Sequence, residues 1–185
     1  MNEIFKRFCG SGKLIAVYHE DSKPDTFDLG TVLCVDDDFV LMQLLSLDGC
    51  YDGIAVFSIA EVARIEVDTQ YVAKLNTLMG CLQQEVGGWQ PAANEHNLLE
   101  SVLLEIKRTK RLATIMLCSS AESVLGTIEE FGSNWLSVRQ IDDYGRPDGI
   151  CYFQTADIAS IYCNSAAEQR IECLIIASQH DALDR

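Results

Sequence analysis

Residues 30–65 of this chain recur 96 positions later, as residues 126–161. The two segments align without a gap, and ten of the 36 aligned pairs are identical. Ordinary residue usage would give only about two identities by chance. Because each copy is longer than a solenoid repeat and long enough to enclose its own core, the repeat predicts a tandem duplication of one domain.

Each copy shows the same order of hydrophobic patterns. Amphipathic spacing predicts a helix before and after a group of short, apolar, β-branched strands. In the first copy the pattern predicts helices at 2–9 and 71–82 and strands at 14–19, 30–35, 39–47, 54–58 and 62–67. In the second copy it predicts helices at 97–107 and from 171 and strands at 112–118, 126–131, 135–141, 150–154 and 158–163.

One stretch between the copies has the composition of a linker. Residues 87–94 combine glycines with Gln90-Pro91, which favour turns and loops. The expected organisation is therefore a first domain at 1–86, a linker at 87–94 and a second domain at 95–185. Trp89 stands in this linker, where it packs within the chain or anchors a partner protein, because aromatic anchors dominate binding hot spots.

The segment Gly30–Phe39 resembles the first motif of the Sm-like family, in which a glycine bends the second strand and an Asp opens the following turn. The resemblance implies a helix plus a five-stranded, strongly bent small β-barrel in each copy. The expected fold class is thus mainly β with flanking helices, as a tandem Sm-like duplication. It also implies single-stranded RNA as a ligand.

The RNA-binding positions of that family are not matched. An Asn that helps to bind a base in the family is Val40 here and Leu136 in the second copy, and the turn Asp becomes Gly132. The family's second motif, Arg-Gly, is replaced by Ala60-Glu61 and Ala156-Asp157. These departures predict weak RNA binding or none.

The net charge of the chain also predicts weak RNA binding or none. Twenty-eight acidic residues against 14 basic ones give a net charge of −14, which repels phosphate backbones. One basic cluster is a candidate RNA or partner contact, although cations are also favoured at a helix C-terminus for structural reasons. It comprises Lys107, Arg108, Lys110 and Arg111.

The cysteines and the lengths of the apolar runs indicate where in the cell the protein is expected. The eight cysteines are scattered, form no C-x-x-C pair and lie among apolar residues, which predicts reduced thiols in the cytoplasm. No apolar run approaches the ~20 residues that span a bilayer, and residues 1–8 lack the apolar core of a signal peptide. We expect a cytoplasmic protein with no membrane partner.

Residues able to carry out catalysis are few. The three histidines, His19, His96 and His180, stand in no recognisable nucleophile motif. The triplet Asp36–Asp38 reads as a hairpin tip rather than a metal site, because the second copy replaces it with Gly132-Ser133-Asn134. We expect no enzyme activity and no cofactor.

Aromatic residues recur at equivalent positions in the two copies. The pairs Phe39/Trp135 and Phe57/Phe153 therefore read as core residues. The sequence as a whole predicts a non-catalytic interaction or assembly module that binds protein partners or self-associates. The alternative is a single-stranded RNA-binding regulator.

Overall fold

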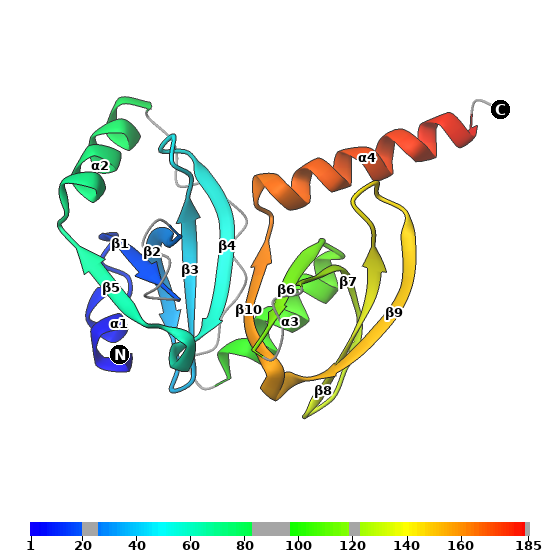
Figure 1. The fold of residues 1–185 in the computed structure, drawn as a ribbon, viewed down its shortest axis with the longest axis horizontal. Helices are drawn as coiled ribbons and strands as arrows, with labels where there is room; N and C mark the ends of the chain where they lie inside the picture. The colour runs from blue at the N-terminus through cyan, green and yellow to red at the C-terminus, as the bar shows by residue number, and fades with distance from the viewer. Residues whose placement is uncertain (20–25, 83–96, 119–122, 184–185) are drawn as a thin grey trace. The chain divides into compact units, whose positions relative to one another are not determined.

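The computed structural model describes residues 1–19, 26–82, 97–118 and 123–183 (Figure 1). The chain divides into two compact units, Met1–Val102 and Leu103–Arg185. Each unit is described by itself below. The predicted linker at 87–94 lies outside the described residues, so this boundary stays a prediction.

The first unit is a five-stranded antiparallel sheet with a helix on either side of it in the chain. Its strands lie in the order β5-β1-β2-β3-β4. The elements are α1 (Asn2–Phe8), β1 (Leu14–Tyr18), β2 (Asp28–Val35), β3 (Phe39–Leu45), β4 (Tyr51–Ser58), a 3-10 turn (Ile59–Glu61), β5 (Arg64–Val67) and α2 (Gln70–Leu82).

The second unit repeats this element order. Its strands lie in the order β10-β6-β7-β8-β9, and every pair within the unit is antiparallel. The elements are α3 (Leu98–Thr109), whose first turns count with the first unit, β6 (Ala113–Leu117), β7 (Ser123–Phe131), β8 (Trp135–Ile141), β9 (Pro147–Gln154), a 3-10 turn (Thr155–Asp157), β10 (Ile158–Cys163) and α4 (Ala166–Leu183).

Strand register follows the sequence repeat. Gly30 pairs with Leu44 in the first unit, and Gly126 pairs with Gln140 in the second, so both partners are shifted by the same 96 positions. A Cβ at Gly30 would lie 2.0 Å from the Gln43 carbonyl oxygen, and one at Gly126 would lie 2.1 Å from that of Arg139. Only glycine allows the two strands to approach so closely, which explains why it stands in both copies.

One core cluster of the first unit lies between its sheet and α2. Val72 and Leu75 of α2 pack on buried side chains from three strands, which are Leu14, Ala16, Tyr18, Leu29 and Leu45. Their spacing of three residues on a helix places both on one face. Burial of this apolar stripe is what fixes α2 on the sheet.

The predicted Sm-like barrel is wrong. In the first unit β5 and β4 lie at opposite ends of the strand order, as do β10 and β9 in the second, so neither set of five closes on itself. A glycine-bent hairpin is a local feature that open sheets and barrels share. Closure depends on pairing between the first and last strands, which a local motif does not encode. The coarser prediction, mainly β with flanking helices, is confirmed.

Four strands begin earlier than the sequence predicted. β2 begins at Asp28 and β7 at Ser123, before the expected starts at 30 and 126. β4 begins at Tyr51 and β9 at Pro147, three residues before the expected starts at 54 and 150. Pro147, which precedes the expected strand, already pairs with Ile141 of β8. The connecting turn is therefore shorter than its Gly- and Asp-rich composition indicated.

Candidate interaction surface

The predicted basic cluster lies at and just beyond the C-terminal end of α3. Arg108 donates two hydrogen bonds to the Glu105 carboxylate, at 2.8 and 2.6 Å, and Arg111 donates one to the Asn164 side chain at 2.6 Å. Lys110 has a φ of 53° and ends the helix. The ammonium of Lys107 lies 5.9 Å from the centroid of the Phe131 ring. Both guanidinium groups of the cluster therefore hold local structure together.

Carboxylates accompany these cations. The pKa of Glu129 is lowered, first by a hydrogen bond from Arg139 and, among smaller causes, by the positive charge of Lys107. The surface around Lys107 thus has mixed charge rather than the basic face that a nucleic-acid backbone requires. Trp89, the remaining predicted contact residue, lies outside the described residues.

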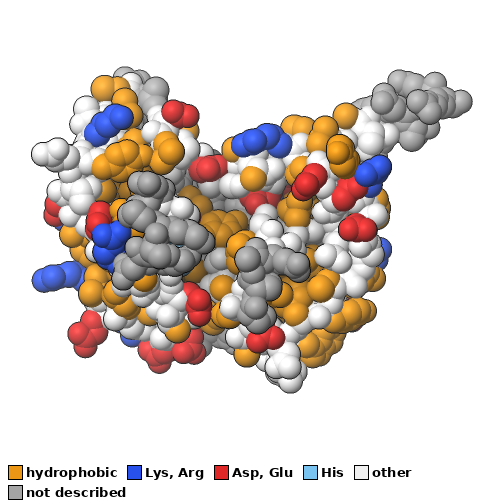
Figure 2. Space-filling view, viewed as in Figure 1, with side chains coloured by type: hydrophobic (Ala, Val, Ile, Leu, Met, Phe, Trp, Pro, Cys, Tyr) orange, Lys and Arg blue, Asp and Glu red, His pale blue; other side chains and the backbone are white. Residues whose placement is uncertain are grey.

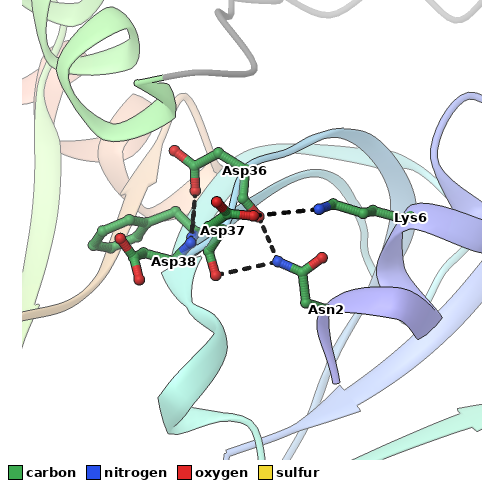
Figure 3. Close-up of polar contacts among 6 residues, drawn as sticks. Asn2, Lys6, Asp36, Asp37 and Asp38 are labelled. Atoms are coloured by element: carbon green, nitrogen blue, oxygen red, sulfur yellow. Dashed lines mark hydrogen bonds and ion pairs between the residues drawn. The ribbon is translucent and has the colours of Figure 1, made fainter.

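The acidic hairpin tip between β2 and β3 forms hydrogen bonds within its own turn and with α1 and α3 (Figure 3 shows the turn and α1). One oxygen of Asp36 accepts the N–H groups of Asp38 and Phe39 at 3.0 and 2.6 Å. Its other oxygen accepts the N–H of Leu98, the first residue of α3, at 2.8 Å. The side-chain amide of Asn2 donates to the Asp36 carbonyl at 2.7 Å. The three N–H donors of Asp38, Phe39 and Leu98 occupy the Asp36 carboxylate as those of a turn and a helix cap do.

In the part of the chain that the structure describes, no group of three or more His, Cys, Asp or Glu residues could hold a metal ion. His19 lies 2.9 Å from the Asp28 carboxylate and edge-on to the Phe57 ring. Burial raises the pKa of the Cys163 thiol to about 12, so this sulfur stays protonated and unreactive near neutral pH. His96 and the His180 side chain lie outside the described residues.

An exposed apolar surface lies on one face of β8 and β9, where Figure 2 shows hydrophobic side chains gathered. The register places Trp135 of β8 and Ile150 and Tyr152 of β9 on the same face. The exposed fractions are 68% for Tyr152, 44% for Ile150 and 37% for Trp135. We call Trp135, Ile150 and Tyr152 the β9 surface. Sequence reasoning missed it, because Trp135 was predicted to belong to the core.

Trp135 is held in place at this surface. A Cβ at Gly132 would lie 2.5 Å from the indole nitrogen of Trp135, so the ring packs directly on the glycine. The Gly132 N–H donates to the Trp135 carbonyl at 2.9 Å, and the Tyr152 ring lies 6.3 Å from the indole, centroid to centroid. A Gly three residues before an exposed aromatic residue was the sequence signal for this arrangement.

The backbone edge of β9 is protected over only part of its length. Among the described strands of its unit, β9 pairs with β8 alone. Pro147 lacks an N–H and Asp148 is charged, which are common ways of blocking an exposed edge. The segment Ile150–Gln154 carries no charge and no proline. An apolar edge of this kind is a template for pairing with another strand.

The edge strand of the first unit differs. β5 has four residues, and two of them, Arg64 and Glu66, are charged and form an ion pair of 3.0 Å. Short length and charge are the features that keep an edge unpaired. The β9 edge is therefore the better candidate for contact with another chain.

Comparison with known proteins assigns this chain to no family. No family model, curated protein or solved structure matches this chain. The Sm-like resemblance thus finds no support outside the motif on which it rested. No helix within the described ranges has the length and apolar character needed to span a bilayer.

Proposed function

We propose that this chain is a non-catalytic assembly module that pairs with a second copy of itself through β9. The observation that carries the proposal is the uncharged edge Ile150–Gln154 beside the exposed rings of Trp135 and Tyr152. Pairing satisfies the backbone groups of the edge, and contact between side chains removes apolar surface from water.

An antiparallel pairing about a two-fold axis fits this edge. Centred on Tyr152, it places Ile150 opposite Gln154 of the second copy and the two Tyr152 side chains opposite each other. Aromatic pairs across strands stabilise a sheet, and two-fold dimers are the commonest oligomers. The segment is self-complementary because it carries no charge that would repel its own copy.

Charge and thiols bear on the partner and the compartment. A net charge of −14 and the mixed charges around Lys107 disfavour single-stranded RNA as the ligand. None of the eight cysteines, each among the described residues, forms a disulfide, which supports a reducing compartment such as the cytoplasm. Since two acidic copies repel each other, added salt should strengthen the dimer by screening.

Sedimentation equilibrium over a range of concentrations tests the proposal. The wild-type chain should be a concentration-dependent dimer, and Tyr152→Lys should weaken dimerisation at least about tenfold, because two like charges then face each other across the axis. Tyr144→Lys is the matched control, since Tyr144 is 72% exposed in the adjacent turn but lies outside β9. It should leave the dimer intact.

Two outcomes would contradict self-pairing. One is a wild-type chain that stays monomeric at every concentration, which would leave another protein's strand as the remaining occupant of the edge. The other is an equal loss of dimer in Tyr144→Lys and Tyr152→Lys, which would trace the effect to net charge rather than to the strand.

A further inference from the structure

A cavity of about 410 Å³ opens on the first unit, lined by α1 and β5 with the residues that directly precede them (Figure 1 labels both elements). Its volume lies within the usual range for small-ligand sites. Six of its eight lining residues are apolar, and they include Ile4 and Phe8 of α1 and Ile65 and Val67 of β5. We call this cavity the α1–β5 groove. Its lining supplies a surface on which an aliphatic chain can lie.

The chain itself covers these apolar side chains only in part. The exposed fractions are 43% for Ile4 and 36% for Val67, and Ile65 is half-buried. In the second unit, Ile161 and Cys163 stand at the positions of Ile65 and Val67, and both are fully buried. The repeat therefore keeps these positions apolar, and the first unit leaves them open to a ligand.

The two polar residues of the lining are both arginines, and one of them is fixed by its own unit. Arg64 forms an ion pair with Glu66 at 3.0 Å, and its guanidinium carbon lies 4.0 Å from the centroid of the Tyr18 ring. The second unit has Ser160 at this position. Arg64 thus serves as a preorganised part of the wall, which a ligand does not have to order on binding.

Arg7 is the guanidinium that a ligand can engage. It is exposed, and among the residues that the structure describes it forms no hydrogen bond, ion pair or ring contact, not even with Glu3 one turn before it on α1. Asp68, which follows β5, is paired with Lys13 at 2.7 Å. Arg7 therefore places an unpaired positive charge beside an apolar wall, in a chain whose net charge is −14.

The strand in this wall favours a free ligand over a peptide. A peptide that binds beside a strand gains affinity from main-chain hydrogen bonds to the strand edge. β5 has only four residues and two of them are charged, which are features that keep an edge unpaired. The groove instead offers apolar side chains and a guanidinium. A carboxylate accepts two parallel hydrogen bonds from a guanidinium and carries the single charge that Arg7 matches.

We infer that the α1–β5 groove binds a free aliphatic carboxylate. The stem of this ligand lies on Ile4, Phe8 and Val67, and its carboxylate faces Arg7. The site lies within the first unit and does not involve β9, so it stands or falls independently of self-association.

Amide chemical shifts of the full chain, titrated with n-hexanoate, test the inference. The shifts should concentrate at residues 1–8 and 63–67. n-Hexanol has the same stem without the charge, and n-hexylammonium has the opposite charge. Hexanoate should bind these residues about fivefold more tightly than hexanol, as one exposed ion pair allows, and hexylammonium should bind them no more tightly than hexanol.

Two neighbouring residues of α1 locate the charge. Arg7→Gln should weaken hexanoate binding about fivefold, towards the level of hexanol, and leave hexanol binding unchanged. Lys6→Gln is the matched control, because Lys6 does not line the groove and its ammonium pairs with Asp37 at 3.3 Å. It removes the same charge and should leave hexanoate binding unchanged.

A third variant locates the stem. Ile4→Gln should weaken hexanoate and hexanol binding alike, by about threefold, because part of the apolar wall becomes polar. Ile4 is exposed, so the unit should fold normally. Equal binding of hexanoate by Ile4→Gln and the wild type would place the ligand elsewhere and contradict the inference.

Three further outcomes overturn the inference. Hexanol binds as tightly as hexanoate, no probe shifts the groove residues, or Arg7→Gln and Lys6→Gln lose hexanoate binding equally. A peptide is the remaining occupant to exclude, and acetyl-Leu-Leu-Leu with a free carboxylate probes it. If this peptide binds the groove at least about tenfold more tightly than hexanoate, the site takes the chain terminus of a partner protein, and a free ligand is wrong.

Discussion

Ile54 and Ile150 are the same residue at equivalent positions of β4 and β9, yet they differ in burial. Ile54 is fully buried, whereas Ile150 is 44% exposed. Ile54 pairs with Gln43 and Ile150 with Arg139, so the registers are also equivalent. A repeated sequence thus gives a repeated backbone without giving a repeated core.

The neighbouring strand shows where the two units diverge. On the face shared with Ile54, β3 presents Leu41, which is 1% exposed, whereas β8 presents Ser137 at that position. The hydroxyl of Ser137 bonds back to Glu130 at the bulge of β7. Both strands carry a polar residue opposite the isoleucine, Gln43 in β3 and Arg139 in β8. The units therefore differ in that Gln43 is buried and Arg139 is exposed, and in the replacement of Leu41 by Ser137.

The largest expected difference comes from placing a lysine at each isoleucine. Ile54→Lys should lower the free energy of unfolding by about 4 kcal/mol or more, because an unpaired charge would be buried. Ile150→Lys should change it by about 0.5 kcal/mol or less, since the ammonium reaches water. Urea unfolding followed by circular dichroism measures both.

The comparison fails if the two variants lose similar stability. Urea unfolding should be repeated at low protein concentration, where any dimer dissociates, so that the loss of an interface is not mistaken for the loss of a core. A stable Ile54→Lys variant would mean that β4 is less buried in solution than in the structure.

Truncating the equivalent phenylalanines of β4 and β9 should give a smaller difference in the free energy of unfolding. Phe57→Ala should cost about 3–5 kcal/mol, because its buried ring packs edge-to-face on Phe5. Phe153 is only half-buried, so Phe153→Ala should cost about 1–2 kcal/mol. Thermal or urea unfolding of the two variants gives the difference, and equal losses would contradict the asymmetry.

Phe57 and Phe153 also show how much of the fold could be predicted from the sequence. The repeat predicted the equivalence of strands, and Gly30 and Gly126 marked the close approach of strands in both units. It also predicted that Phe57 and Phe153 are both buried, which is right for Phe57 and wrong for Phe153. The local sequence pattern indicates which residues are apolar. Burial depends on which surfaces cover a strand, and that is set by tertiary structure.

The candidate sites were less predictable. The basic cluster at 107–111 is visible in the sequence, and so is the i,i+3 spacing of Glu105 and Arg108. Asn164, which accepts from Arg111, lies 53 residues away and was not visible as a partner. The β9 surface was visible only in part, through Pro147 and the replacement of Leu41 by Ser137.

The smallest expected effect is at the hairpin tips. In the first unit the Asp36 carboxylate accepts hydrogen bonds at the position where the second unit has Gly132. Asp36→Ala should cost about 1–2 kcal/mol, since three N–H donors, including that of Leu98, lose their acceptor. Asp37→Ala is the matched control. Its ion pair with Lys6 at 3.3 Å is exposed, so its loss should cost about 0.5 kcal/mol or less and should vanish at high salt. Urea unfolding at low and high salt separates the two variants, because the cap of Asp36 should persist in salt. Equal, salt-sensitive losses would mean that the tip contributes only through charge, and that α3 does not depend on Asp36 for its first turn.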